Sequence, residues 1–135
     1  NSTTPTASVI SLGDFDKTNK NTHDFVGWLW ASLPGICDIG QYSGSSSAVT
    51  VDCGFAAAPR YILIKAVNRS EPWYVFDHAR GIAAGNEPYL QLDKTNAQVT
   101  GDDAIDPTSS GFTVNTGFGS KFNESGNTYI YLAIA

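Results

Sequence analysis

A chain of 135 residues is long enough to bury one core, and its length predicts a single domain. Only 16% of the residues are charged, while glycine, serine, threonine and asparagine are abundant, which is typical of an all-β protein with many turns. The net charge of -5 and the pI of about 4.7 argue against nucleic acid or an anionic membrane as a partner. No apolar run approaches the roughly 20 residues of a membrane span, so membrane insertion is not expected. The composition and charge do not exclude neutral ligands such as sugars.

The amino end is predicted to be an arm. Residues 1–24 are mostly polar and are expected to link the domain to an upstream region or to lie across a neighbouring copy. The chain contains no methionine and begins at Asn1, which suggests a piece of a longer polypeptide. Residues 25–30 (FVGWLW) alternate and are predicted to form the first strand. Trp28 and Trp30 share a face of it, which favours the core or a subunit interface, with a sugar-stacking platform as the alternative.

After the arm, the apolar pattern is short and alternating, which is the period of β-strands. The further predicted strands are residues 36–44, 44–52, 59–67, 73–77, 89–93, 111–115 and 127–135. In residues 59–67, Ile62 and Ile64 share one face and Tyr61 and Leu63 the other, so this apolar strand is expected to be central. Residues 94–110 are predicted to be a long polar connection. About eight strands predict an antiparallel β-sandwich, jelly-roll-like, over residues 25–135.

The stretch WYVFDHARG (residues 73–81) places an acid, an imidazole and a guanidinium close together. In a strand, Asp77 and His78 would point to opposite faces, and no nucleophile elbow such as GxSxG accompanies them. We therefore expect Asp77 and Arg80 to tie off the end of the strand, with His78 packed against its neighbours. Ligand binding by His78 or Arg80 is the alternative, and catalysis is the least favoured reading.

Two further groups of side chains have the chemistry of a metal or redox site, one of aspartates and one of cysteines. Asp102, Asp103 and Asp106 could hold calcium, but their spacing does not match a calcium loop, so a solvated acidic turn is expected and no metal is assigned. Cys37 and Cys53 lack the spacing of a zinc site. Two unpaired core thiols are favoured over a disulfide.

The order of the motifs resembles a known family. PRYILIK, FDHARG, YLQL, GFTVN and ESGNTYIYLAIA follow one another, after the entry segment VGWLWASLPGICDIGQYSG. This series is similar to the carboxy-terminal domains of bacteriophage tail fibres and related tail proteins, notably those of marine phages and cyanophages. The resemblance covers most of residues 25–135. It implies a trimeric virion component, assembled in the host cytoplasm, that attaches to the host surface and is not an enzyme.

On this basis we expect attachment without catalysis and without a cofactor, as a homotrimer on an upstream fibre shaft. The expected receptor is a host surface glycan or outer-membrane component. A structural trimerisation cap and a monomeric carbohydrate-binding module are the alternatives. The tip loops, residues 43–47, 68–73 and 101–107, are the expected contact regions, because binding residues often sit on loops held by a rigid scaffold. The candidate receptor-binding residues are Tyr42, Arg69, Trp73, His78, Arg80, Asp102 and Asp103.

Overall fold

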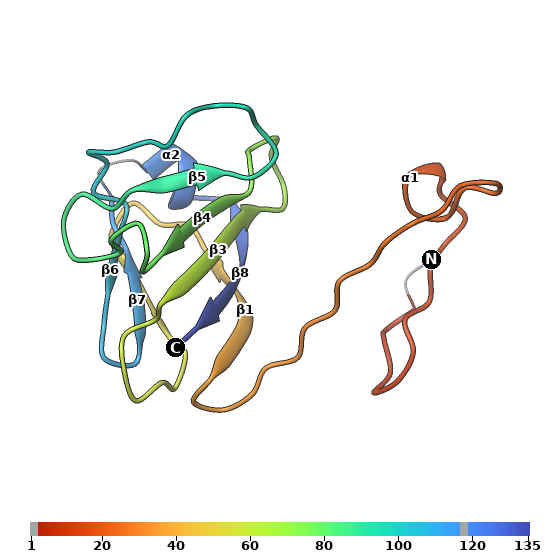
Figure 1. Cartoon of the computed structure of the whole chain (residues 1–135), viewed down its shortest axis with the longest axis horizontal. Helices are drawn as coiled ribbons and strands as arrows, with labels where there is room; N and C mark the ends of the chain where they lie inside the picture. Colours follow the sequence, from red (N-terminus) through yellow and green to blue (C-terminus); the bar gives the residue numbers. More distant parts are fainter. Residues whose placement is uncertain (1–2, 117–118) are drawn as a thin grey trace.

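The computed structural model describes residues 3–116 and 119–135, and the regular secondary structure of this part of the chain is almost entirely β (Figure 1). Its strands are β1 (Cys37–Ser43), β2 (Val49–Asp52), β3 (Tyr61–Ala66), β4 (Tyr74–Asp77), β5 (Tyr89–Gln91), β6 (Ile105–Pro107), β7 (Gly111–Val114) and β8 (Thr128–Ile134). Two single-turn helices accompany them, α1 (Asp16–Asn19) in the arm and α2 (Gly119–Phe122) before β8.

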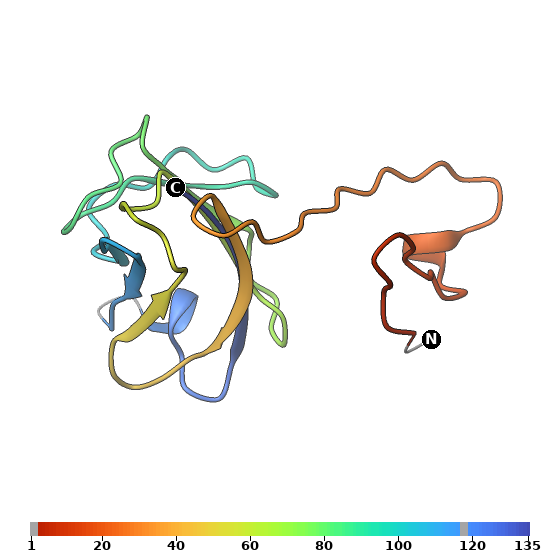
Figure 2. The same ribbon diagram turned by 90° about the horizontal axis from the view of Figure 1, so that it is seen from below.

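The strands form two antiparallel sheets. The larger sheet has the order β1-β8-β3-β4-β5, and the smaller one has the order β2-β7-β6. Figures 1 and 2 show the two sheets facing one another, with the arm extending away to one side. The predicted all-β antiparallel sandwich is confirmed. The apolar carboxy-terminal strand β8 is paired on both sides, with β1 and β3, so it does not form an exposed edge.

The core lies between the sheets and follows from the alternation of the strands. On β3, Ile62 and Ile64 are fully buried while Tyr61 and Leu63 are only partly buried and face outward. An aromatic cluster fills the space under α2, where the ring of Phe122 contacts those of Tyr74 and Tyr89 edge-on at centroid distances of 4.6 and 5.6 Å. Such edge-to-face pairs add about 0.5–1.5 kcal/mol each beyond the area that they bury.

Two of the predicted elements are wrong. Residues 25–30 do not form a strand: this segment is extended and exposed, and the boundary between arm and sandwich lies after it, near Leu33, which bridges to Cys37. Alternating apolar residues need a partner strand, and none pairs with this segment within the described chain. The second wrong element is the predicted polar connection of residues 94–110, because its residues 105–107 form the strand β6, which pairs with β7. The part of the chain that the structure describes therefore has eight strands, and one of them differs from the predicted set.

Both cysteines are free thiols. Cys53 packs against the core, as predicted, whereas Cys37 is half-buried at the start of β1. Burial raises the pKa of the Cys53 thiol to about 12, and the neighbouring Asp38 carboxylate adds to this shift. The thiol is therefore protonated and a poor nucleophile at neutral pH.

The close approach of β7 to β2 gives a first prediction. Gly111 lies opposite Asp52, and an added Cβ would collide with the carbonyl oxygen of Val51. We expect Gly111→Ala to lower the free energy of unfolding by about 1–3 kcal/mol, because the ladder must open to admit the methyl group. Gly27 in the arm has open space around it, so Gly27→Ala should change the stability by less than about 0.5 kcal/mol. Denaturant unfolding of both variants measures the difference, and equal stability would contradict this packing.

The buried tyrosines give a second prediction. Burial raises the pKa of Tyr42, Tyr74 and Tyr131 well above the ordinary value of 10.0, because the ionised phenolate is poorly solvated inside the sandwich. The unfolded chain loses these protons first, so their contribution to stability is complete below about pH 10 and is lost at higher pH. Denaturant titrations should show the free energy of unfolding falling steeply above about pH 10. Phenolate absorbance of these three rings that titrates at the ordinary pKa in the folded chain would contradict the prediction.

Candidate functional site

One row of apolar side chains crosses the whole width of the outer face of the five-stranded sheet. Strand pairing aligns one residue from each strand in a row, and side chains of directly opposite residues point to the same face. The row that passes through the outward-facing Leu63 consists of Ile39, Leu132, Leu63, Val75 and Leu90. An outer face of this kind is unusual for an antiparallel sheet that has one side toward solvent, which commonly carries polar residues there.

The arm passes this face and forms a groove with it. The groove has a volume of about 570 Å³, and a row of aromatic and apolar side chains lines it together with one carboxylate. The lining residues are Trp28, Trp30, Tyr61, Leu63, Trp73, Leu92 and Asp93. The chain has three tryptophans, and all of them line this groove.

The three tryptophans come from two different segments. Trp73 precedes β4, and its backbone N–H donates to Asp93 Oδ1 at 3.0 Å while its carbonyl accepts the N–H of Leu92 at 2.9 Å. This ring is therefore positioned by the end of β5. An extended segment precedes β1 (Figure 1). Trp28 and Trp30 come from this segment and are two residues apart in it.

The tryptophan rings are accessible to solvent. Trp28, Trp30 and Trp73 expose 76%, 57% and 38% of their surface, so the prediction that Trp28 and Trp30 lie in the core is wrong. The physical reason is that, among residues 3–116 and 119–135, no further sheet or helix packs over this side of the large sheet. A subunit interface at these residues stays a prediction, and Trp73 is exposed enough to remain a candidate receptor-binding residue.

The groove has the chemistry of a site for ring-shaped, uncharged ligands. Indole faces pack against apolar surfaces, and an aromatic side chain with a polar tip suits ligands that are apolar on one side and hydroxylated on the other. The carboxylate of Asp93 offers a second oxygen that can accept hydrogen bonds from hydroxyl groups. Sugars present both kinds of surface.

Tyr42 is a wrong candidate for receptor binding. Its side chain is 7% exposed, its hydroxyl donates to the carbonyl oxygen of Phe122 at 2.6 Å, and its ring stacks on Tyr129 at 5.0 Å. Tyr42 belongs to β1, and the alternation of side chains along this strand points it into the core. Tyr42 falls within the predicted strand of residues 36–44, directly before the predicted tip loop of residues 43–47.

The other candidate receptor-binding residues in the loops form separate contacts within the fold. Arg69 pairs with Glu71 and with Glu124, which joins the β3–β4 loop to the segment before β8. Asp102 accepts a hydrogen bond from the Tyr89 hydroxyl at 2.6 Å and pairs with Lys121 at 3.1 Å. These side chains connect parts of the fold, and the structure does not bring the predicted receptor-binding residues together at one place.

The polar cluster after β4 is mainly structural. Asp77 accepts the backbone N–H of Arg80 at 3.0 Å and pairs with its guanidinium, so the predicted tie at the end of the strand is confirmed. Asp77 and His78 nevertheless line one open hollow with Arg60 near the carboxy terminus, whereas the strand alternation predicts that they diverge. Gly81 lies in the left-handed region with φ of 102°, where the chain turns at the end of the strand. No serine, threonine or cysteine is among the described residues that line this hollow.

The acidic loop is not a solvated turn. Asp106 is half-buried, and its carboxylate accepts hydrogen bonds from Gly85 and Asn115. Asp103 also accepts from Asn115, at 2.7 Å. The buried Glu87 joins these two aspartates, and carboxylate oxygens of the three residues lie within 4.8 Å of one another. Among the described residues, this is the one group of acidic, histidine or cysteine side chains close enough to share a metal ion. Sequence reasoning missed Glu87 because it is distant along the chain.

Sequence comparison shows the family of the whole chain. The model of a family described as a domain of unknown function (DUF7483) matches residues 1–135, so the chain belongs to that family. The match includes the arm as well as the sandwich, and both sides of the aromatic groove therefore fall within one family unit. No curated protein and no solved structure gives a match. In the described part of the chain, no helix has the length and apolar character needed to cross a membrane.

Proposed function

We propose that this chain is a non-catalytic attachment domain that binds host surface glycans through the aromatic groove. The observation that carries the proposal is the convergence of all three tryptophans, from two distant segments, on one exposed groove with a carboxylate. The motif order that resembles the distal domains of phage tail fibres supports the same function. The proposed setting is a virion tail appendage, assembled in the host cytoplasm and active outside the cell.

The distribution of polar residues supports attachment over catalysis. Asp77 and Arg80 bond to each other, and Asp102 bonds to Tyr89 and Lys121. A catalytic centre needs an acid, a base or a nucleophile converging on a reacting atom. The groove itself offers aromatic and aliphatic surface with a single carboxylate.

Several copies would strengthen a weak site. A shallow groove for sugars binds weakly by itself, whereas linked copies raise the overall affinity by about 100-fold or more without a new contact. A homotrimer on an upstream fibre shaft, as proposed here, would supply that multiplicity. Its partner on the host is a surface glycan or another outer-membrane component.

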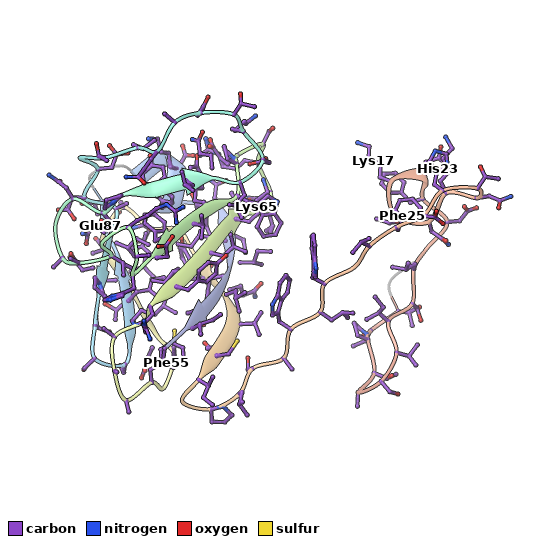
Figure 3. All side chains as sticks on the ribbon, in the orientation of Figure 1. Lys17, His23, Phe25, Phe55, Lys65 and Glu87 are labelled. Carbon is purple, nitrogen blue, oxygen red and sulfur yellow. The ribbon has the colours of Figure 1, made fainter. Side chains whose placement is uncertain are left out.

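A second candidate function is assembly. The arm exposes many large apolar side chains in the single chain, and these side chains are Val9, Ile10, Leu12, Phe15, Phe25, Val26 and Leu29. Figure 3 shows Phe25 on the arm, far from the sandwich. Contiguous exposed apolar surface indicates a contact with another protein surface. A structural trimerisation cap would use the arm in this way, with recognition elsewhere in the fibre.

Tryptophan fluorescence tests the groove directly, because no tryptophan lies outside it. The full chain is first screened on an array of bacterial surface oligosaccharides, and binding of a hit is then followed by the change in fluorescence. We expect Trp73→Ala to weaken binding about tenfold, the equivalent of roughly 1.4 kcal/mol of lost stacking. Trp28→Ala and Trp30→Ala should also weaken it.

Leu29→Ala is the matched control, because Leu29 lies between the two arm tryptophans, is 68% exposed and does not line the groove. Trp73→Phe should retain part of the affinity, since an aromatic face remains. Unchanged binding in Trp73→Ala would contradict the groove as the site, and an array without any hit would contradict glycan attachment by this chain.

Light scattering on the full chain tests the oligomeric state. A trimer would have three times the 14.4 kDa mass of one chain, and Val26→Asp in the exposed arm should dissociate it. The reason is that a charge is costly to bury in an apolar interface. A monomer that still binds a glycan would instead support the carbohydrate-binding module, and a trimer that binds neither glycans nor host cells would support the cap.

A further inference from the structure

A buried carboxylate lies at the side of the sandwich opposite the arm (Figure 3). Glu87, in the connection between β4 and β5, is fully buried. Its Oε2 accepts the backbone N–H groups of Ala104 and Ile105 at 2.9 and 3.0 Å. Its Oε1 is buried as well, and has no hydrogen-bond partner among the described residues. A buried oxygen without a partner costs about 1–3 kcal/mol, and more if it is charged.

Two other carboxylates lie close to the Glu87 side chain. Oxygens of Asp103 and Asp106 lie within 4.8 Å of one from Glu87, and none of the three residues forms an ion pair within the described part of the chain. Three like charges at this separation disfavour one another unless a cation or a proton lies between them. Burial raises the pKa of Glu87, and the charge of Asp103 adds to the shift.

The side chain of Asn115 completes the group. Its Nδ2 donates to Asp103 and to Asp106, and its backbone is held by a hydrogen bond from its N–H to the carbonyl of Ala104. Rotation of this amide by half a turn would present Oδ1 to the same centre. The available donors are then carboxylate and amide oxygens with no nitrogen or sulfur ligand, which is the set that calcium prefers.

We propose that Glu87, Asp103 and Asp106 bind a calcium ion, with the Asn115 amide oxygen as the fourth side-chain ligand. Glu87 supplies the buried end of the site through Oε1. Asp103 is exposed, so water completes the coordination from the solvent side. The buried carboxylate distinguishes this group from a surface cluster of acids.

Calcium would tie together parts of both sheets. Glu87 lies two residues before β5 of the larger sheet, Asp106 belongs to β6 of the smaller sheet, and Asn115 follows β7. The connection is also held by the N–H of Gly85, which donates to Asp106 Oδ1 at 3.2 Å. Binding would therefore stabilise the loops at this end of the sandwich, independently of what the aromatic groove binds.

The test uses the full chain after treatment with a chelator. Isothermal titration with calcium chloride should show one ion per chain, with a dissociation constant at or below about 1 mM, as for extracellular calcium modules. Calcium should raise the melting temperature by roughly 5 °C at saturation, while sodium chloride of equal ionic strength should not.

Asp103→Asn is the first variant, because Asp103 is exposed and the fold does not depend on burying it. Without calcium its melting temperature should be equal to or above that of the parent chain, since repulsion is relieved. Its calcium affinity should fall by about tenfold or more. Glu87→Gln, which keeps the shape of the buried side chain, should lose the calcium response. Asp102→Asn is the matched control from the same loop, and it should keep the response.

Three results would overturn the proposal. The first is the absence of both heat and a melting shift with calcium, together with stabilisation at low pH, which would mean that Glu87 holds a proton. The second is an equal response to magnesium, which would remove the calcium assignment. The third is a calcium response that persists in Asp103→Asn and Glu87→Gln, which would place the ion elsewhere.

Discussion

The structure depends on the position of β8 between β1 and β3. This last strand of the chain pairs with strands from the beginning and the middle, and it forms the centre of the larger sheet with β3. Its alternation sends Tyr129, Tyr131 and Ala133 into the core, while Ile130, Leu132 and Ile134 lie on the outer face. Both faces of this central strand are therefore apolar. The inner face of the larger sheet is covered by the smaller sheet, and its outer face carries the groove.

The groove exists because an apolar outer face needs a cover and has only a partial one. The arm brings two tryptophans to it, and the end of β5 fixes the third. Trp73, whose backbone is fixed by hydrogen bonds with Asp93 and Leu92, loses little conformational freedom when a ligand binds. The same surface suits a second copy of the chain, so the proposed attachment and the proposed assembly would both use this partly covered face.

The polar residues of the sandwich mostly connect loops. Asp77 holds the turn after β4, Arg69 joins the β3–β4 loop to the segment before β8, and Asp102 links β5 to α2 through Tyr89 and Lys121. The group around Glu87 differs from these because one of its oxygens is buried and not satisfied by the protein. Within the described residues, the fold therefore leaves an apolar face without a full cover and a buried carboxylate oxygen without a partner.

The amino-acid sequence by itself determined the class of the fold. Period-two alternation, as in Ile62 and Ile64 against Tyr61 and Leu63, depends only on the pleat of a strand, and glycine and proline mark the turns between strands. The link between Asp77 and Arg80 is also local, spanning three residues. The tertiary structure decided the rest, because each remaining feature depends on contacts between distant segments. Pattern alone does not show whether residues 25–30 have a partner strand, that Tyr42 faces inward, that Trp73 meets the arm, or that Glu87 reaches Asp103 and Asp106.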